Sequence, residues 1–269
     1  MKEIPKEINV VLDTYFHYLD VKLPNLIHSF YLYGSITLGA FKNGFSDIDF
    51  IAVVKRKVSD DDLIILKEIH KDVHRKFPNS ILDGWYILNE DIESLNEEGN
   101  LCIRFNDGKF QGLHKFKINS IDAFQLKKYG IAVRGLNIDH VDISVNWDTI
   151  QTNMRDNLNS YWLSWLKNSK KFPTVKYLSL FVSLRSIEWG ILGVSRLYYT
   201  FKEKDITSKV GAGEYVLEAV PKRWHKIIKE SMRLRTDNKK SYYKSIFTRR
   251  KDAIDYMEFM IKECNKLIR

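Results

Sequence analysis

The chain has 269 residues, is 44% hydrophobic, and contains only 13 glycines, 5 prolines and 2 cysteines, which excludes disordered, fibrous and disulfide-framework proteins and a thiolate metal cluster. The net charge of +9 is uneven, since residues 1–150 carry 18 Lys and Arg against 22 Asp and Glu, whereas residues 151–269 carry 25 against 12. The basic second half favours a polyanionic ligand such as a nucleoside triphosphate or a nucleic acid, although a basic surface without a ligand is the commoner case.

The first half of the chain predicts a small α/β unit in which helices and strands alternate. The clearest helix begins at Ser59, a good N-cap residue, because three Asp follow it in the first turn and an apolar stripe runs behind them. The expected segments are a helix (5–28), a strand (30–34), a turn or helix start (35–41), a strand (47–55), a helix (59–76), a strand (81–88), loop with short strands (89–118) and a strand (130–135).

From about Trp147 onward the pattern changes to helices. Pro173 and Pro221 each stand where a helix would begin. The expected helices are 147–168, 174–202, 208–218, 222–235 and 241–268. We therefore predict two domains of an α+β protein, an α/β domain over residues 1–145 and a helical bundle over residues 146–269.

No segment of the chain reaches the apolar length needed to span a bilayer. The first residues, MKEIPKEINVVLD, carry charges where a signal peptide needs an apolar core. We therefore expect a cytoplasmic protein without a membrane partner, as a monomer or weak homodimer.

Two carboxylates open the strand at 47–55. Asp47 and Asp49 are two residues apart, so both point to one face of the strand, where they repel unless a cation lies between them. Magnesium fits, because it takes few carboxylates together with phosphate oxygens. Gly34 and Ser35 offer backbone N–H groups and a hydroxyl to a phosphate, and Asp83 can add a carboxylate at the same edge. A lone Asp-x-Asp or Gly-Ser is a weak signal, and the combination is far more specific.

The stretch GSITLGAFKNGFSDID, residues 34–49, resembles the motif of the nucleotidyltransferase superfamily that includes DNA polymerase beta and the antibiotic adenylyltransferases. The stretch SRLYYTFKEKDITSKVGAGEYVLEAVP resembles the C-terminal helical region of the streptomycin and spectinomycin adenylyltransferases. In those enzymes an Arg is followed thirteen residues later by a Lys, and Arg196 and Lys209 reproduce that spacing. The resemblance runs from about residue 30 to 235, and it implies a polymerase-beta-like α/β domain followed by a helical domain.

The resemblance implies a role for each of these residues. Asp47 and Asp49 would hold Mg²⁺. Asp83 would stand in the place of the catalytic glutamate that removes the proton from the attacking hydroxyl, although its shorter side chain leaves a third metal ligand as the alternative. The residues near the triphosphate of ATP would be Gly34, Ser35, Ser46, Arg196 and Lys209.

The implied reaction is the transfer of AMP from ATP to a hydroxyl of an aminoglycoside-like or aminocyclitol antibiotic, with release of pyrophosphate. The alternatives are the same chemistry on a protein or RNA acceptor, and a non-catalytic nucleotide-binding protein; we expect a small-molecule acceptor rather than nucleic acid. The streptomycin-modifying relatives bind their cationic drug with acidic side chains on the helix before the Arg. The corresponding residues 176–186 contain no carboxylate, so Glu188 is the nearest substitute.

Overall fold

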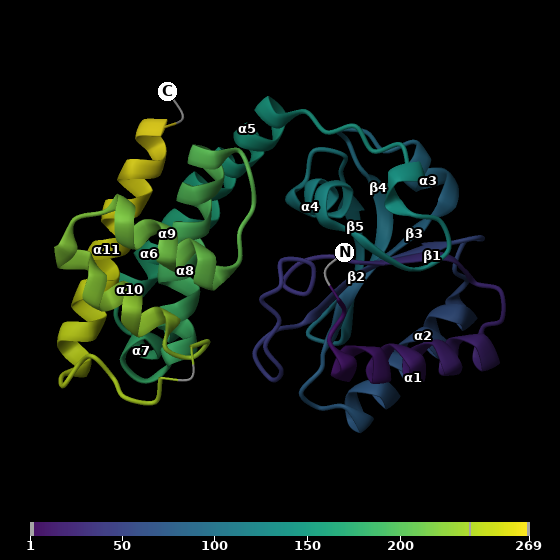
Figure 1. The fold of residues 1–269 in the computed structure, drawn as a ribbon, viewed down its shortest axis with the longest axis horizontal. Helices are drawn as coiled ribbons and strands as arrows, with labels where there is room; N and C mark the ends of the chain where they lie inside the picture. The colour runs from purple at the N-terminus through teal and green to yellow at the C-terminus, as the bar shows by residue number, and fades with distance from the viewer. Residues whose placement is uncertain (1–2, 237, 268–269) are drawn as a thin grey trace. The chain divides into compact units, whose positions relative to one another are not determined.

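Helices and strands are mixed in the first part of the chain, and the second part contains helices and no strand among the residues that the structure describes (Figure 1). The computed structural model describes residues 3–236 and 238–267. The chain divides into two compact units, Met1–Asn146 and Trp147–Arg269. The predicted mixed α and β class is confirmed.

A six-stranded sheet forms the centre of the first unit, in the order β5-β4-β3-β2-β1-β6. Its strands are β1 (Ile27–Leu32), β2 (Ile48–Val54), β3 (Leu82–Leu88), β4 (Asn100–Asn106), β5 (Lys109–Phe116) and β6 (Ile131–Arg134). The helices are α1 (Lys6–Lys22), α2 (Asp60–Lys76), α3 (Asn89–Glu93) and α4 (Ile121–Tyr129), with a short 3-10 helix at Ile138–His140. Among the strand pairs of the described residues, only β2 and β3 run parallel, and α2 is the crossover that joins them.

Helices cover both faces of this sheet, because successive strand residues point to opposite sides. One face, which includes Phe30 and Phe50, packs against α1 and α2. The other face, which includes Tyr31 and Ile51, packs against α3 and α4. Figure 1 shows α1 and α2 on one side of the sheet and α4 on the other. Asp49 lies between Ile48 and Phe50 of β2 and therefore belongs to the α4 face.

On the face of the sheet that packs against α1 and α2, three buried polar side chains connect α1, α2 and β3. The hydroxyls of Tyr15 and Tyr86 are 2.5 Å apart, and Nε2 of His70 lies 2.9 Å from the Tyr86 hydroxyl. The His70 ring stacks on Phe105 with its centroid 3.8 Å away. Burial lowers the pKa of His70 to about 3, so this histidine is neutral in the folded chain.

The predicted helix over 59–76 is confirmed, and its N-terminus is a capping box. The Ser59 hydroxyl accepts the Asp62 N–H at 3.1 Å, and the Asp62 carboxylate accepts the Ser59 N–H at 2.9 Å. Other boundaries were wrong. The predicted helix 5–28 ends at Lys22, because Pro24 follows and Asn25 takes a left-handed conformation with φ 62°.

The segment after β1 forms turns, one of the two predicted alternatives, and contains no helix, so the predicted alternation of helix and strand was wrong at this point. Gly34 and Gly39 have φ values of 71° and 68°, which interrupt a right-handed helix before it can extend. Without a crossover helix, β2 returns antiparallel to β1. The glycine turn and the first residues of β2 are therefore at the same end of the sheet.

The second unit is a bundle built around one long helix, α8, which contacts α9, α10 and α11. Its helices are α5 (Trp147–Asn157), a π-helical turn (Leu158–Trp162), α6 (Leu163–Lys170), α7 (Val175–Val182), α8 (Leu184–Glu203), α9 (Lys209–Ala219), a 3-10 turn (Lys222–Trp224), α10 (His225–Met232) and α11 (Ile246–Leu267). The last predicted helix thus begins five residues later than expected, and its predicted end at residue 268 is outside the described residues.

The predicted single helix over 174–202 was wrong, because Ser183 divides it into α7 and α8. The Ser183 hydroxyl accepts the N–H of Ser186 at 3.1 Å and so begins a new helix. The two helices meet at an angle of 104°. No single described helix is long and apolar enough to cross a membrane; α7 and α8 satisfy that test only as a bent pair.

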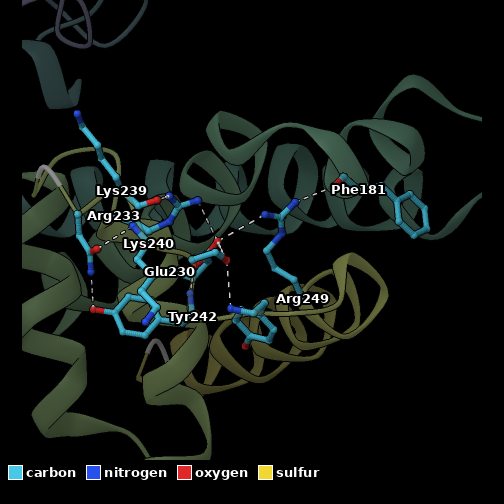
Figure 2. Close-up of polar contacts among 10 residues, drawn as sticks. Phe181, Glu230, Arg233, Lys239, Lys240, Tyr242 and Arg249 are labelled. Carbon is cyan, nitrogen blue, oxygen red and sulfur yellow. Dashed lines mark hydrogen bonds and ion pairs between the residues drawn. The ribbon is translucent and has the colours of Figure 1, made fainter.

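A fully buried carboxylate joins the last elements of this bundle (Figure 2). Glu230 of α10 forms ion pairs with Arg233 at 3.3 Å and Arg249 at 3.5 Å, and it accepts the backbone N–H of Tyr242 at 2.9 Å. Arg249 of α11 also donates to the carbonyl of Phe181 in α7, at 2.7 Å. Glu230 therefore holds α10, α11 and the segment between them together.

Candidate active site

The antiparallel turn after β1 and the parallel pairing of β2 with β3 bring acidic residues to one end of the sheet. Asp47 directly precedes β2, Asp49 lies within it, and Asp83 of β3 is the register partner of Asp49. Asp47 is exposed, Asp49 half-buried and Asp83 4% exposed. The structure thus brings the three predicted carboxylates together.

A fourth carboxylate, Asp122 in the first turn of α4, belongs to this group. The indole N–H of Trp85 donates to its Oδ2 at 3.2 Å. Burial and then the charges of Asp122, Asp47 and Asp83 raise the pKa of Asp49 to about 8. We call these four residues the acidic edge. Asp122 was not predicted from the sequence, and the available signal was Ser120, which caps α4.

One cation, Arg104 of β4, partly offsets this charge. It stacks on the ring of Trp85, with Cζ 4.6 Å from the ring centroid, and its charge lowers the pKa of Asp49 and of Asp83. Its Nη1 is buried and has no hydrogen-bond partner among the described residues. Arg104 was also missed, because nothing in the sequence distinguishes it from other strand arginines.

The β4–β5 turn fixes Asp83. The backbone N–H of Gly108 donates to its Oδ1 at 3.0 Å. Burial raises the pKa of Asp83, and the N–H groups of Gly108 and Asp107 act in the opposite direction. A carboxylate with a raised pKa and a fixed orientation is suited to accept a proton.

The glycine turn lies directly against Asp49. A Cβ at Gly34 would lie 2.0 Å from Oδ2 of Asp49, so only glycine fits here. The hydroxyl of Ser35 is buried and has no partner among the described residues. Ser46 has a structural contact, since its hydroxyl accepts the N–H of Lys42 at 3.1 Å within the next turn.

The two predicted cations of the second unit lie near each other. Lys209 is the first residue of α9. Burial lowers its pKa, and the charges of Arg235 and then of Arg196 in α8 act in the same direction. Glu188 forms ion pairs with Nζ of Lys209 at 3.2 Å and with Nε of Arg235 at 2.6 Å. Glu188 is 3% exposed and already paired, so it is not a free carboxylate for a cationic acceptor.

The neighbouring aromatic residues Trp85 and Tyr86 have separate environments. Tyr86 belongs to the buried polar group with Tyr15 and His70. Trp85 faces Asp122 and Arg104 at the acidic edge. Tyr86 thus packs in the core of the first unit, whereas Trp85 contacts the charged side chains of Asp122 and Arg104.

No group of three or more His, Cys, Asp and Glu side chains in the described part of the chain is arranged to hold a metal ion. The acidic edge nevertheless includes side chains that could contribute two ligands, because Asp47 directly precedes β2, Asp49 lies two residues later, and the charge of Asp47 acts on Asp49.

The model of the family described as aminoglycoside adenylyltransferase, C-terminal domain, matches residues 185–263. The predicted resemblance to the aminoglycoside adenylyltransferases is confirmed. The chain also shares the fold of the spectinomycin adenyltransferase AAD(9) from Enterococcus faecialis, solved with ATP and spectinomycin, with a TM-score of 0.69 and 16% sequence identity over 94% of this chain and 99% of that one. No curated protein sequence matches the chain. The family match and the shared fold together support a nucleotidyltransferase enzyme, as predicted.

Proposed function

We propose that the protein transfers AMP from ATP to a hydroxyl group of a small aminocyclitol or aminoglycoside-like molecule and releases pyrophosphate. The observation that carries this proposal is that Gly34 of the glycine turn packs against Asp49, and that the carboxylates of Asp47 and Asp83 are near enough to act on Asp49. A turn that can approach a phosphate and a carboxylate that can hold a metal ion are the two parts that nucleotidyl transfer needs side by side.

The residues present fit Mg²⁺. Burial and then the charges of three other carboxylates raise the pKa of Asp49, and a bound divalent cation would relieve the repulsion among those charges. Asp47 and Asp49 would hold the ion, with phosphate oxygens and water as the remaining ligands. When bound, the ion supplies charge neutralisation for the triphosphate.

The protein side chains then bind, orient and accept a proton. Ser35 offers its unpartnered hydroxyl to a phosphate oxygen. Asp83, held by the β4–β5 turn, accepts the proton of the attacking hydroxyl at its carboxylate, which makes base rather than metal ligand our preferred role. Arg196 and Lys209 contribute positive charge to the binding of the triphosphate.

The acceptor that we favour has few positive charges. Residues 176–186 contain no carboxylate, and Glu188 is committed to Lys209 and Arg235. A polycationic drug would therefore meet lysines and arginines in this part of the second unit rather than acidic partners. The spectinomycin bound by AAD(9) supports an aminocyclitol as the first molecule to try.

The test is a search for a product. We would incubate the protein with Mg²⁺, each nucleoside triphosphate and a panel of antibiotics, and look by mass spectrometry for acceptors heavier by one nucleoside monophosphate. Asp49→Asn should abolish the product with the fold intact, because losing one charge-stabilising group typically costs about 10²–10³-fold in rate. Asp139→Asn, which changes an exposed carboxylate of the 3-10 helix, is the control. Full turnover by the Asp49 variant would refute the proposal.

A further inference from the structure

The buried carboxylate of Glu188 is shared by two cations from different helices. Its Oε1 lies 3.2 Å from Nζ of Lys209 and 2.6 Å from Nε of Arg235. The side chains of Glu188 and Arg235 are 5% and 9% exposed, and Lys209 is 22% exposed. Of the two cations, Lys209 is therefore the one that can still reach a ligand.

The surroundings of Lys209 restrict it further. Its Nζ lies 5.2 Å from the centroid of the Trp189 ring, and Ser208 caps the helix that Lys209 begins by accepting the N–H of Gly211 at 3.0 Å. A lysine side chain otherwise has many rotamers, and ordering it costs up to about 2 kcal/mol of conformational entropy. Here the ion pair with Glu188 and the contact with the Trp189 ring hold the ammonium group before any ligand binds.

We propose that Glu188 is a positioning residue, whose carboxylate holds the Lys209 ammonium group ready for a nucleotide phosphate while Arg235 keeps Glu188 in place. This inference rests on the proposed function, because it assumes that Lys209 binds phosphate. Protein kinases show the same physical device in another fold, where a lysine that contacts the phosphates must be paired with a glutamate from a neighbouring helix.

The proposal predicts that removing the Glu188 charge weakens the binding of a polyanion, whereas simple electrostatics predicts tighter binding. Removing a negative charge beside a phosphate site should tighten the binding of a polyanion if charge alone mattered. If Glu188 orients Lys209, Glu188→Gln instead weakens binding, because the ammonium group is released and repelled by Arg235. Glu188→Asp keeps the charge and withdraws the carboxylate by one methylene, so any loss in that variant is geometric.

The experiment is a double-mutant cycle with binding as its readout. Calorimetry with MgATP, and separately with inorganic tripolyphosphate, would compare wild type with Glu188→Gln, Glu188→Asp, Lys209→Ala and the Glu188→Gln/Lys209→Ala double variant. We expect about tenfold weaker binding for each single variant and no further loss in the double variant, because Glu188 acts through Lys209. The matched control is Glu203→Gln, which removes the same charge from the exposed end of α8.

The outcomes separate this inference from the proposed function. If Lys209→Ala weakens binding and neither Glu188 variant does, or Glu188→Gln tightens it, the positioning role is wrong and the function stands. Additive losses in the double variant would also overturn it, since a merely structural glutamate acts independently of Lys209. If wild type binds neither ligand, or if Lys209→Ala binds both normally, the assumption about Lys209 fails and the inference fails with it. Circular dichroism confirms that each variant is folded; if Glu188→Gln does not fold, Glu188→Asp alone decides.

Discussion

At the scale of single residues, the closest packing in the candidate site is between Gly34 and Asp49. The pattern of Gly-Ser and Asp-x-Asp predicted a phosphate-binding turn at Gly34 and a carboxylate at Asp49 near the start of a strand, and the structure brings the two into contact. What the pattern could not show is how close they are. The space for a Cβ at Gly34 is already taken by the Asp49 carboxylate, so the turn and the carboxylate are fitted to each other.

Gly34→Ala should therefore abolish AMP transfer. The methyl group would push on Asp49, and a non-glycine residue at φ 71° adds roughly 1–2 kcal/mol of backbone strain. Gly112→Ala is the control, because Gly112 has φ 106° and no atom lies within 4 Å of the position that a Cβ would take there, so it tests the strain without the clash. Product formation and thermal unfolding would be measured for both. Equal activity in the two variants would show that the close packing is unimportant.

Asp122 and Arg104 show the limit of sequence reasoning at this scale. Asp47, Asp49 and Asp83 were predicted because they open or lie within strands of clear pattern. Asp122 lies on a nine-residue helix with little amphipathic pattern, and Arg104 lies on a strand within a segment predicted as loop with short strands of no stated bounds. Both reach the acidic edge through the tertiary arrangement of α4 and β4, which local periodicity does not encode.

At the scale of elements, the buried group of Tyr15, His70 and Tyr86 connects α1, α2 and β3. It makes stability depend on pH in a direction that follows from the His70 pKa. Since that pKa is about 3 in the folded chain and about 6.5 in an unfolded one, the unfolded state binds more protons between these values. The contribution of His70 is thus complete above pH 6.5 and is lost as the pH falls toward 3.

His70→Phe should weaken this dependence. Between pH 6 and 4 the wild type should lose up to about 1.4 kcal/mol more unfolding free energy per pH unit than the variant does. Phenylalanine can keep the stacking on Phe105, although it gives up the hydrogen bond to Tyr86. Urea unfolding at a series of pH values would measure both slopes. Parallel slopes would mean that His70 is not buried in its neutral form.

In the helical unit, the buried carboxylate of Glu230 connects α10 and α11, as the Tyr15, His70 and Tyr86 group connects elements of the first unit (Figure 2). Glu230→Gln should destabilise the protein by about 3–5 kcal/mol, because it removes one partner of buried ion pairs and leaves the arginines without it. Glu258→Gln breaks the solvent-exposed ion pair with Lys170 and should cost less than about 1 kcal/mol. Denaturant unfolding compares the two, and similar small losses would contradict the central role of Glu230.

The elements that were predicted well are those with long apolar stripes or clear caps, such as α2 and β2. The errors fall where a local side-chain contact or a special backbone conformation overrides the pattern. Ser183 interrupts an otherwise continuous helical pattern by capping α8, and Gly34 and Gly39 prevent a helix after β1. Such breaks depend on a few atoms, so an apolar pattern read over ten or more residues does not detect them.

At the scale of the whole molecule, the charge is concentrated in the second half of the chain, where Lys and Arg exceed Asp and Glu by 25 to 12. This excess suits a triphosphate and disfavours a polycation. The reaction class could be predicted because its motif lies within one short stretch. The acceptor could not, because acceptor contacts come from scattered side chains with no fixed spacing.

We therefore expect turnover to depend on the charge of the acceptor. Spectinomycin should be a better acceptor than streptomycin, which carries guanidinium groups, and the ratio of the two rates should decrease when salt screens the repulsion. Pyrophosphate release at low and high ionic strength would measure both rates. A preference for streptomycin that survives in high salt would show that carboxylates outside residues 176–186 bind the acceptor.

The β1–turn–β2 segment has one more consequence. Gly34 and Asp49 are only fifteen residues apart in the chain, and the antiparallel return joins them without help from distant parts of the protein. Asp83, Asp122 and Arg104 come from three other elements. Damage to strand β4, which lies between β3 and β5, or to α4 should accordingly impair Asp83, Asp122 and Arg104 while the turn proposed to bind the nucleotide keeps its conformation. Catalysis would then be lost before affinity.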